Sequence, residues 1–465
     1  MIHKTVKRVI AISMASIFVL GSVACGKDNK PTTVSPGPGT AQSGENTTNP
    51  SSEKRIITVG TWYDHYYTSD HTDPYDNPKV SNTDTAQMQI DNMRAVEQKY
   101  NIEFRFKNLT WDGTINSINT SIMAGKPDCD IYEVDLQFGV PAIVNNCALA
   151  LEDFIPADDD IFTDQKYMAY LNIMGQEKNY LFRAQAIDAK LGAYPLAFNL
   201  DMVEAAGLEN PQDLYDRGEW TWDVFKSYLK KLTKDTNGDG ATDVYGYGGY
   251  WTNALNQLLM SNGAQIAADK TTGVDSKATV EVFQLLYDIY NVEKSARPWN
   301  PDSWEDNEKV YTQGVIAFWP TAAWIMNEYK DASLEFEVGV VPWPVGPSGN
   351  KDTNSHCLVA GSYYFIPVGV EDPLFVYKVF ADWSYWYKED ETLATDDSWF
   401  RDSLINERNF NYLVEMGEKT HMDLWGSLSL KDFNVISMLA GEVTAATLAE
   451  QNKQTIQDAL NIIFE

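Results

Sequence analysis

The sequence predicts an α/β protein with two domains, and three observations lead to this prediction. The chain has 465 residues, which is more than one hydrophobic core usually serves. Residues 55–135 alternate strand-like and helix-like patterns, and a β-α-β-α order is typical of a largely parallel sheet with helices on both faces. Strand-like segments return late in the chain, so we expect the backbone to pass between the domains more than once.

The first residues have the pattern of a targeting segment. The basic stretch HKTVKR precedes an apolar run, residues 9–20, that is too short to span a bilayer. The following GSVAC places Cys25 where a bacterial lipoprotein would be acylated, so residues 1–24 are predicted to be a signal peptide. A secreted product without lipid is the alternative, because Ser22 stands where a lipoprotein signal usually has Leu or Val.

Residues 25–54 read as a disordered tether behind this cysteine. The stretch is rich in Pro, Gly, Ser, Thr and Asn and has almost no apolar side chains to bury. The net charge of −30 argues against partners that are nucleic acids or anionic membrane surfaces. The remaining cysteines are Cys129, Cys147 and Cys357; their apolar surroundings favour buried thiols over a single disulfide, and their spacing matches no zinc site.

The elements of the folded part can be placed by periodicity. RIITVG reads as a strand with Ile57 and Val59 on one face, residues 84–100 as an amphipathic helix, and IEFRFKN as the next strand. INSINTSIMAGKPDCDIYEVDL repeats helix and strand. TWDVFKSYLKKLTK, with Thr221 as N-cap, TVEVFQLLYDIYN and the C-terminal SMLAGEVTAATLAEQNKQTIQDALNIIF are predicted helices. VIAFWP, FEVGVVPWP and CLVAGSYYFIPV are predicted strands.

Two strand ends carry side chains suited to binding. Ligands of such sheets sit beyond the carboxyl ends of the strands. One end carries Trp62, Tyr63 and Asp64, and the other carries Asp135 and Gln137. Core packing is the alternative for the two rings. Asp135 is favoured over Glu133 as a ligand contact, since strand alternation puts Glu133 on the same face but deeper.

The segment DTNGDGATD, residues 235–243, has the spacing of a calcium-binding loop. Its predicted oxygen ligands occupy positions 1, 3, 5, 7 and 9 of an EF-hand pattern: Asp235, Asn237, Asp239, the carbonyl of Ala241, and Asp243. Position 12, which should be a bidentate Glu, is Gly246, and no helix pattern follows. A structural Ca²⁺ is therefore favoured over a regulatory sensor, and a metal-free turn rich in Asx residues is the alternative.

A second polar loop could in principle bind metal. It holds His65, Asp70, His71, Asp73 and Asp76. Their spacing matches no known site, so a solvated acidic loop is the favoured interpretation.

Several blocks, taken in order, resemble a known family. They are PDCDIYEVDL with NNCALALEDF, AYPLAFNLDMVEAAGL with WTWDVF, GVIAFWPTAAWIMNEY, and VGVVPWPVGPSGN. Together with the lipoprotein signal, they resemble the extracellular solute-binding proteins of ATP-driven sugar importers, the maltose-binding-protein-like family 1. The calcium-like loop is similar to an insertion found in this family.

The resemblance implies a two-lobed α/β fold of the periplasmic-binding-protein type II, with a hinged cleft between the lobes. Residues 55–193 and 319–352 would form the N-terminal lobe, and residues 194–318 and 353–465 the C-terminal lobe. The chain would cross near Tyr194, Phe318 and Thr353. Stacking rings and carboxylates suit a sugar site, and the expected binding residues are Trp62, Tyr63, Asp64, Asp135, Gln137, Tyr250, Trp251, Trp319 and Tyr363. Trp343, between two prolines, is expected to pack structurally.

The resulting hypothesis is a non-catalytic lipoprotein. Anchored through Cys25 on the extracellular face of the cell membrane, it would capture a carbohydrate, in particular an oligosaccharide, and deliver it to ABC permease subunits. We expect a monomer with one structural Ca²⁺. The alternatives are a secreted glycoside hydrolase, which would also show rings and paired carboxylates, and a surface adhesin.

Overall fold

The computed structural model describes residues 54–65, 68, 83–173, 175–185, 193–329, 332–352, 354, 356–357, 361–395, 406–430 and 433–464. The predicted signal peptide, Cys25 and most of the tether lie outside the described residues. So do Asp70, His71, Asp73 and Asp76 of the polar loop.

A six-stranded sheet contains the strands predicted near the N-terminus. Its strands, in the order β2-β1-β3-β11-β5-β4, are β2 (Ile102–Asn108), β1 (Arg55–Thr61), β3 (Ile131–Val134), β11 (Tyr363–Phe365), β5 (Leu181–Ala184) and β4 (Met168–Leu171). β1 pairs in parallel with β2 and β3, whereas β11 is antiparallel to both β3 and β5. The predicted parallel sheet is thus confirmed for its first three strands, and the remainder is antiparallel.

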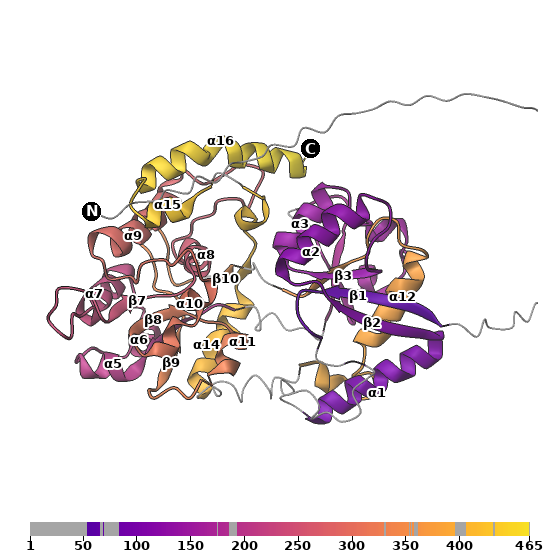
Figure 1. The fold of residues 1–465 in the computed structure, drawn as a ribbon, viewed down its shortest axis with the longest axis horizontal. Helices are drawn as coiled ribbons and strands as arrows, with labels where there is room; N and C mark the ends of the chain where they lie inside the picture. The colour runs from indigo at the N-terminus through magenta and orange to yellow at the C-terminus, as the bar shows by residue number, and fades with distance from the viewer. Residues whose placement is uncertain are drawn as a thin grey trace, which may run out of the picture. The chain divides into compact units, whose positions relative to one another are not determined.

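Helices cover both faces of this first sheet. The elements around it are α1 (Thr83–Tyr100), α2 (Trp111–Ser117), η2 (Ile118–Ile122), α3 (Leu136–Val144), η3 (Leu151–Asp153), α4 (Asp160–Thr163) and α12 (Pro373–Ser384). α1 contacts α12, and residues of both pack with Ile57 and Val59 in one core (Figure 1). Residues of η2 and α3 pack with Tyr132 and Val134 in the other core.

A four-stranded sheet forms a second centre. Its order is β7 (Tyr245–Tyr247), β8 (Ile316–Pro320), β6 (Leu196–Asn199) and β9 (Val338–Val341). β7 is parallel to β8, and β6 is antiparallel to both β8 and β9. The helices that precede or connect these strands are α5 (Leu200–Ala205), α6 (Pro211–Asp216), α7 (Trp222–Leu232), α8 (Trp251–Ser261), α9 (Lys277–Tyr287), η5 (Asp288–Val292), α10 (Trp304–Glu308), η6 (Val310–Gln313) and α11 (Ala323–Glu328).

The C-terminal part is mostly helical. After β10 (His356–Cys357) and β11, its elements are η7 (Glu391–Thr395), α14 (Glu407–Glu418), β12 (Thr420–His421), η8 (Trp425–Ser427), α15 (Val435–Leu439) and α16 (Ala445–Phe464). The prediction of a single long helix at the C-terminus is wrong in one respect. The segment forms two helices, α15 and α16, and between them lies Gly441, which has φ +79°. α14 contacts β9, and α16 contacts α9.

The pairing of the late strands corrects the predicted division into lobes. β8 and β9 both join the second sheet, so residues 319–352 do not belong with residues 55–193. β11 and α12 join the first sheet instead, although they lie within the segment 353–465. The crossing expected near Tyr194 agrees with the pairing of β5 and β6 in different sheets. The crossing expected near Phe318 is absent, and the one near Thr353 leads back to the first sheet. Each segment has a clear strand pattern, but periodicity does not specify which sheet a strand joins.

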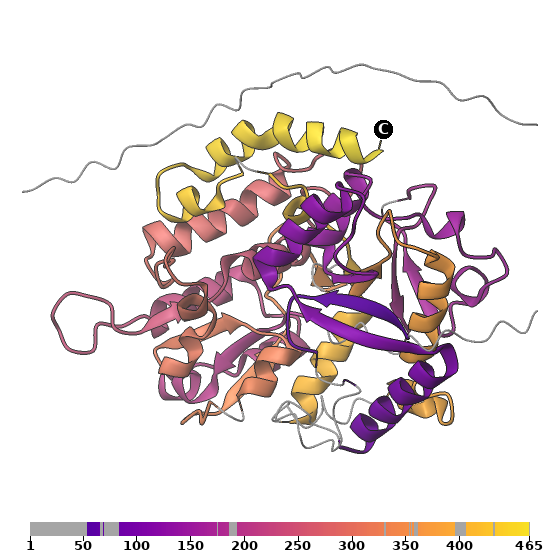
Figure 2. The same cartoon turned by 45° about the vertical axis from the view of Figure 1, so that its right-hand side comes forward.

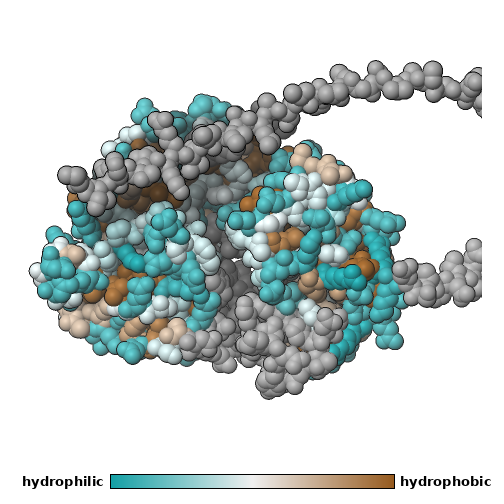
Figure 3. Space-filling model, viewed as in Figure 1, coloured by the Kyte–Doolittle hydropathy of each residue, from teal (hydrophilic) through white to brown (hydrophobic). Residues whose placement is uncertain are grey.

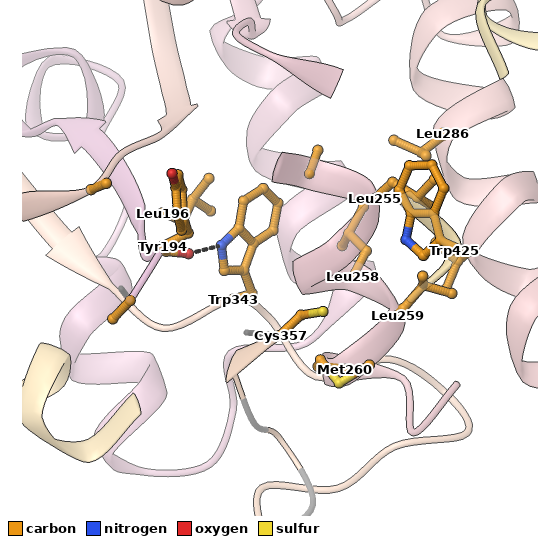
Figure 4. Close-up of a cluster of buried hydrophobic side chains, with 14 of the residues drawn as sticks. Tyr194, Leu196, Leu255, Leu258, Leu259, Met260, Leu286, Trp343, Cys357 and Trp425 are labelled. Carbon is orange, nitrogen blue, oxygen red and sulfur yellow. Dashed lines mark hydrogen bonds between the residues drawn. The ribbon is translucent and has the colours of Figure 1, made fainter. Parts of the chain in front are cut away.

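The core behind the second sheet confirms two predictions. Trp343 is 1% exposed, and its indole Nε1 donates to the carbonyl of Tyr194 at 2.8 Å (Figure 4). Leucines of α8 lie beside it, and the thiol of Cys357 is buried in the same region. Cys129 and Cys147 are also free and buried, as expected.

The surface fits an acidic protein with a buried core. The face seen in Figure 3 is mainly hydrophilic, with hydrophobic residues in small separate patches. Within the described part of the chain, no helix combines the length and apolar character that a membrane span requires.

Candidate functional site

Three aromatic rings meet where β1 ends. Trp62 directly follows the strand and is partly buried. Its ring centroid lies 5.9 Å from that of Trp111 and 6.1 Å from that of Phe138. Trp111 and Phe138, from the first turns of α2 and α3, are 4.4 Å apart. Phe138 is buried but Trp111 is 42% exposed, so the cluster presents apolar ring surface to solvent. We call Trp62, Trp111 and Phe138 the aromatic cluster.

Tyr63 ties this strand end to a buried carboxyl group. Its hydroxyl lies 3.1 and 3.0 Å from the two carboxylate oxygens of Glu133, which is 0% exposed. Ser362 and Tyr364 also donate to Glu133, while burial raises the pKa of its carboxyl. Hydroxyl groups rather than a cation therefore satisfy Glu133, and the sequence argument that it lies deeper than Asp135 agrees with this burial.

Asp135 forms the N-cap of α3. Its Oδ1 accepts hydrogen bonds from the backbone N–H groups of Gln137 (2.8 Å) and Phe138 (3.3 Å). The side chain is 4% exposed, and burial raises the pKa of its carboxyl to about 7. Gln137 is exposed next to it, and Asp64, also exposed, accepts a hydrogen bond from the Asn108 amide at 3.0 Å. Asp64 lies beyond the carboxyl end of β1, and Asp135 and Gln137 beyond that of β3, at the two strand ends expected from the sequence; Asn108, at the end of β2, was not among the predicted residues.

Two ring pairs surround the start of α8. Tyr250, the N-cap residue, lies 5.3 Å from Trp299, and Trp251 lies 6.1 Å from Trp425. The Trp425 indole donates to Asn256 at 2.7 Å. η8, which begins at Trp425, contacts α3 of the first sheet. The second ring pair is therefore next to the helix that Asp135 caps.

Sequence reasoning missed several of these side chains. Trp111 has the appearance of an ordinary residue in an amphipathic helix, and Trp299 and Trp425 lie in segments without clear periodicity. The only available signal was the unusual number of tryptophans, 14 in the whole chain.

Two predicted binding residues are core residues instead. Trp319 is 0% exposed, its ring stacks on Tyr311 at 5.7 Å, and its Nε1 donates to the Tyr329 hydroxyl at 2.7 Å. Tyr363 in β11 is 2% exposed. Both rings belong to the large hydrophobic core cluster, so packing on the faces of the two sheets buries them. The prediction that they face a solute is corrected accordingly.

The calcium-like loop extends from the body between α7 and β7 (Figure 2). Its carboxylates bind backbone N–H groups. Asp235 accepts from Gly238 (2.6 Å) and Gly240 (2.8 Å), and Asp239 accepts from Ala241 (2.8 Å). Asp243 accepts from Thr236 at 2.7 Å, and these hydrogen bonds lower the pKa of its carboxyl.

The fit to Ca²⁺ is partial. Carboxylate and amide oxygens are concentrated in one short loop, which is the donor chemistry that Ca²⁺ prefers. Across the residues described, however, no three His, Cys, Asp or Glu side chains are grouped closely enough to hold a metal ion. The loop has the right donors, whereas their present orientation is that of Asx turns.

A family model for bacterial extracellular solute-binding proteins matches residues 93–375, more than half of the chain. The chain belongs to the bacterial extracellular solute-binding proteins. Among curated relatives, a binding protein of Brucella abortus strain 2308 is 23% identical over 266 residues, covering 54% of this chain. The match spans 58% of the length of that relative.

Solved structures support the fold of this solute-binding protein. A substrate-binding protein of Listeria monocytogenes in complex with cycloalternan superposes with a TM-score of 0.60 at 15% identity, covering 88% of this chain and 100% of that one. The maltose/maltodextrin-binding domain of Bdellovibrio bacteriovorus, bound to maltotriose, gives a TM-score of 0.58 at 15% identity, with coverage of 87% and 100%. These neighbours are two-lobed sugar-binding proteins, and at such low identity the likeness establishes the α/β fold.

Proposed function

We propose that this solute-binding protein captures a carbohydrate, in particular an oligosaccharide, and delivers it to the permease subunits of an ABC importer. The observation that carries the proposal is the aromatic cluster beside Asp135 at the carboxyl ends of the first sheet's strands. Sugar rings stack their apolar faces on such side chains, while carboxylate and amide oxygens accept their hydroxyl groups. Trp111 offers an exposed ring, and Gln137 and Asp64 offer exposed polar groups.

The ligands of the structural neighbours support this substrate class. One neighbour was solved with cycloalternan and another with maltotriose. A solute-binding protein of Thermotoga lettingae, with a TM-score of 0.58, was solved with tagatose. The fold therefore accommodates sugars of several sizes, and the surrounding side chains of each protein must select among them.

The proposed location follows from the first residues of the sequence. Acylation of Cys25 would hold the protein on the extracellular face of the membrane, and residues 25–54 would let the folded part reach the permease. We propose that the protein is a monomer.

We further propose that residues 235–243 bind one structural Ca²⁺. This ion would stabilise the connection between α7 and β7 without contacting the solute.

A hydrolase and an adhesin are the competing proposals. In a hydrolase two carboxyl groups must reach the sugar, one as acid and one as base or nucleophile. Here Glu133 is fully buried behind three hydroxyl donors, and Asp135 uses one oxygen to cap α3. This arrangement favours binding over hydrolysis.

Calorimetric titration of the purified protein with maltodextrins and other oligosaccharides tests the proposal, together with chromatography for released products. We expect saturable binding with the sugar left intact. Trp62→Ala should weaken binding about tenfold or more, because a stacking ring contributes about 1–3 kcal/mol.

Tyr170→Ala is the matched control for the loss of a ring. Tyr170 is a partly buried ring in β4, on the opposite edge of the same sheet, and its replacement should leave the affinity unchanged. Product release would favour a hydrolase, and binding only to a surface polymer or protein would favour an adhesin.

A further inference from the structure

Among the described residues, one arginine makes no hydrogen bond or ion pair. Arg183, in β5, is partly buried, and neither a hydrogen bond nor an ion pair engages its guanidinium. Every other described arginine has at least one such partner: Arg55, Arg94, Arg105, Arg217, Arg297 and Arg408.

This isolation is unusual for the composition of the chain. Acidic residues number 66 against 36 lysines and arginines, so carboxylates are abundant partners. A guanidinium that is partly removed from water loses hydration, and an ion pair or a set of hydrogen bonds normally offsets that loss. Without such a bond among the described residues, the Arg183 guanidinium is available to a group from outside the chain.

The topology places Arg183 at the solute-binding edge of the first sheet. β3 and β5 are both antiparallel to β11, so they run in the same direction and their carboxyl ends share one edge. Asp135 follows β3 at that edge, and Arg183 is the next-to-last residue of β5. Its charge acts on the hydroxyl of Tyr363 in β11: burial raises the pKa of Tyr363, and Arg183 opposes this rise.

The face of the sheet can be assigned as well. A Cβ at Gly139 of α3 would lie 2.8 Å from Cδ1 of Leu181, so Leu181 faces α3. Side chains two residues apart in a strand point to the same face, so Arg183 shares the α3 face of the sheet with Leu181. Arg183 follows Leu181 by two residues, so it lies closer to the carboxyl end of β5. That end is at the same edge of the sheet as Asp135 and the aromatic cluster.

The neighbouring carboxyl groups leave this guanidinium available. Oδ1 of Asp135 is used by the cap of α3, and burial raises the pKa of Asp135 to about 7, which reduces its negative charge near neutral pH. Val134 faces α3, since it would contact a Cβ at Gly139 at 3.4 Å. Glu133, the adjacent residue in β3, therefore points to the opposite face of the sheet.

We propose that Arg183 binds a carboxylate of the solute and makes the site selective for acidic sugars of the uronic acid class. This inference rests on the proposed function and extends it. Guanidinium groups recognise carboxylates through two parallel N–H···O bonds, and the negative charge of the carboxylate makes these bonds stronger than those to neutral hydroxyl groups. β5 lies three strands from β1 in the first sheet, so the aromatic cluster would stack one sugar residue of an oligosaccharide while Arg183 binds the carboxylate of another residue of the same chain.

Calorimetric titration with two matched sets of sugars tests this proposal. One set contains oligomers of galacturonate, glucuronate and mannuronate, including trigalacturonate, and the other contains neutral trisaccharides. We expect at least one uronate oligomer to bind at least about tenfold more tightly than its neutral counterpart. Arg183→Met should reduce that affinity by about 10- to 100-fold, and Arg183→Lys should retain part of it.

Arg105→Met is the matched control. Arg105 lies in β2 of the same sheet and pairs with Glu103 at 2.8 Å, and its loss should leave uronate affinity unchanged. The melting temperature of Arg183→Met should stay near that of the wild type, since Met can replace the packing of the aliphatic stem and no hydrogen bond or ion pair is lost. If that variant fails to fold, salt dependence of wild-type uronate binding is the second measurement, and affinity must fall as salt rises.

The outcomes separate the two proposals. Equal affinity for uronate and neutral oligomers, or unchanged uronate affinity in Arg183→Met, would overturn the role of Arg183 while leaving carbohydrate binding intact. If the wild type binds none of the carbohydrates, the proposed function itself fails.

Discussion

At the scale of single residues, burial rather than ion pairing sets the charge state of the carboxyl groups at the proposed binding edge. Glu133 and Asp135 both have a raised pKa because their carboxyl groups are removed from water, and backbone or hydroxyl donors compensate only partly. Arg183 is the opposite case, a charge that makes no hydrogen bond or ion pair among the described residues. β3, which Glu133 belongs to and Asp135 follows, is separated by β11 from β5, which carries Arg183, and no direct bond joins any two of these side chains.

Asp135→Asn should remove part of the pH dependence of stability. The folded-state pKa of about 7 exceeds the ordinary value of 3.8, so the native state retains a proton that the unfolded state has already lost. Stability therefore falls as pH rises from about 4 to about 7, by about 1.4 kcal/mol for each unit of pKa shift at most. Asn keeps the cap but does not titrate, so the variant should lose this decline.

Urea unfolding at pH values from 4 to 8 measures this effect. Asp64→Asn, at an exposed carboxylate of the neighbouring strand end, is the control for removing a charge. If the free energy of unfolding varies with pH in the same way for the wild type and Asp135→Asn, the raised pKa of Asp135 is contradicted.

At the scale of elements, the structure explains why the calcium-like loop lacks its twelfth ligand. Gly246 lies in β7 directly against α7, where an added Cβ would lie 2.4 Å from the carbonyl oxygen of Leu229 and 2.5 Å from its Cα. No side chain fits there. The sequence departs from the EF-hand pattern at this position because the strand following the loop packs on the helix preceding it.

Gly246→Ala should therefore destabilise the protein markedly. The contact is with backbone atoms, which cannot move aside without shifting α7, so we expect a loss of about 1–3 kcal/mol or more. Gly426→Ala is the control, because nothing lies within 4 Å of an added Cβ at that position. Urea unfolding of both variants provides the comparison, and equal stabilities would show that α7 adapts.

Ca²⁺ binding to residues 235–243 should change the stability of the protein but not its affinity for solute. Addition of Ca²⁺ should raise the melting temperature of the protein, and chelator should lower it, while the affinity for solute changes little. Asp235→Asn combined with Asp239→Asn should abolish the response, because both carboxylates are predicted ligands. A melting temperature that is insensitive to Ca²⁺ would favour the metal-free turn, and a large change in solute affinity alone would contradict a purely structural ion.

At the scale of the whole molecule, the chain ties two sheets together by passing repeatedly between them. The chain passes from one sheet to the other between β5 and β6, between β9 and β11 by way of β10, and between α12 and α14 by way of η7. α3 of the first sheet also contacts η8, and a single hydrophobic cluster includes Phe138 and Trp425. A solute bound at this edge is therefore expected to stabilise more than one sheet.

Saturation with solute should shift the unfolding of both sheets. At about 100 times the dissociation constant, binding to the native state adds about 2.7 kcal/mol to the free energy of unfolding. Hydrogen exchange in urea, followed for peptides covering β1 and β8, measures this separately for each sheet. Protection of the β1 peptide alone would contradict coupling between the sheets.

The sequence alone determined the local elements and the type of protein. Apolar periodicity placed β1, α1, β2 and α7, because a residue's burial within one element depends on spacing along the chain. The order of the family blocks indicated a solute-binding protein, and the strand ends drew attention to Trp62, Tyr63 and Asp135. Tertiary structure decided the rest. In the folded chain β9 pairs in the second sheet and β11 in the first, and Trp319 and Tyr363 are buried. Among the described residues, Arg183 makes no hydrogen bond or ion pair. These outcomes depend on contacts between residues far apart in the chain, and local periodicity carries no information about such contacts.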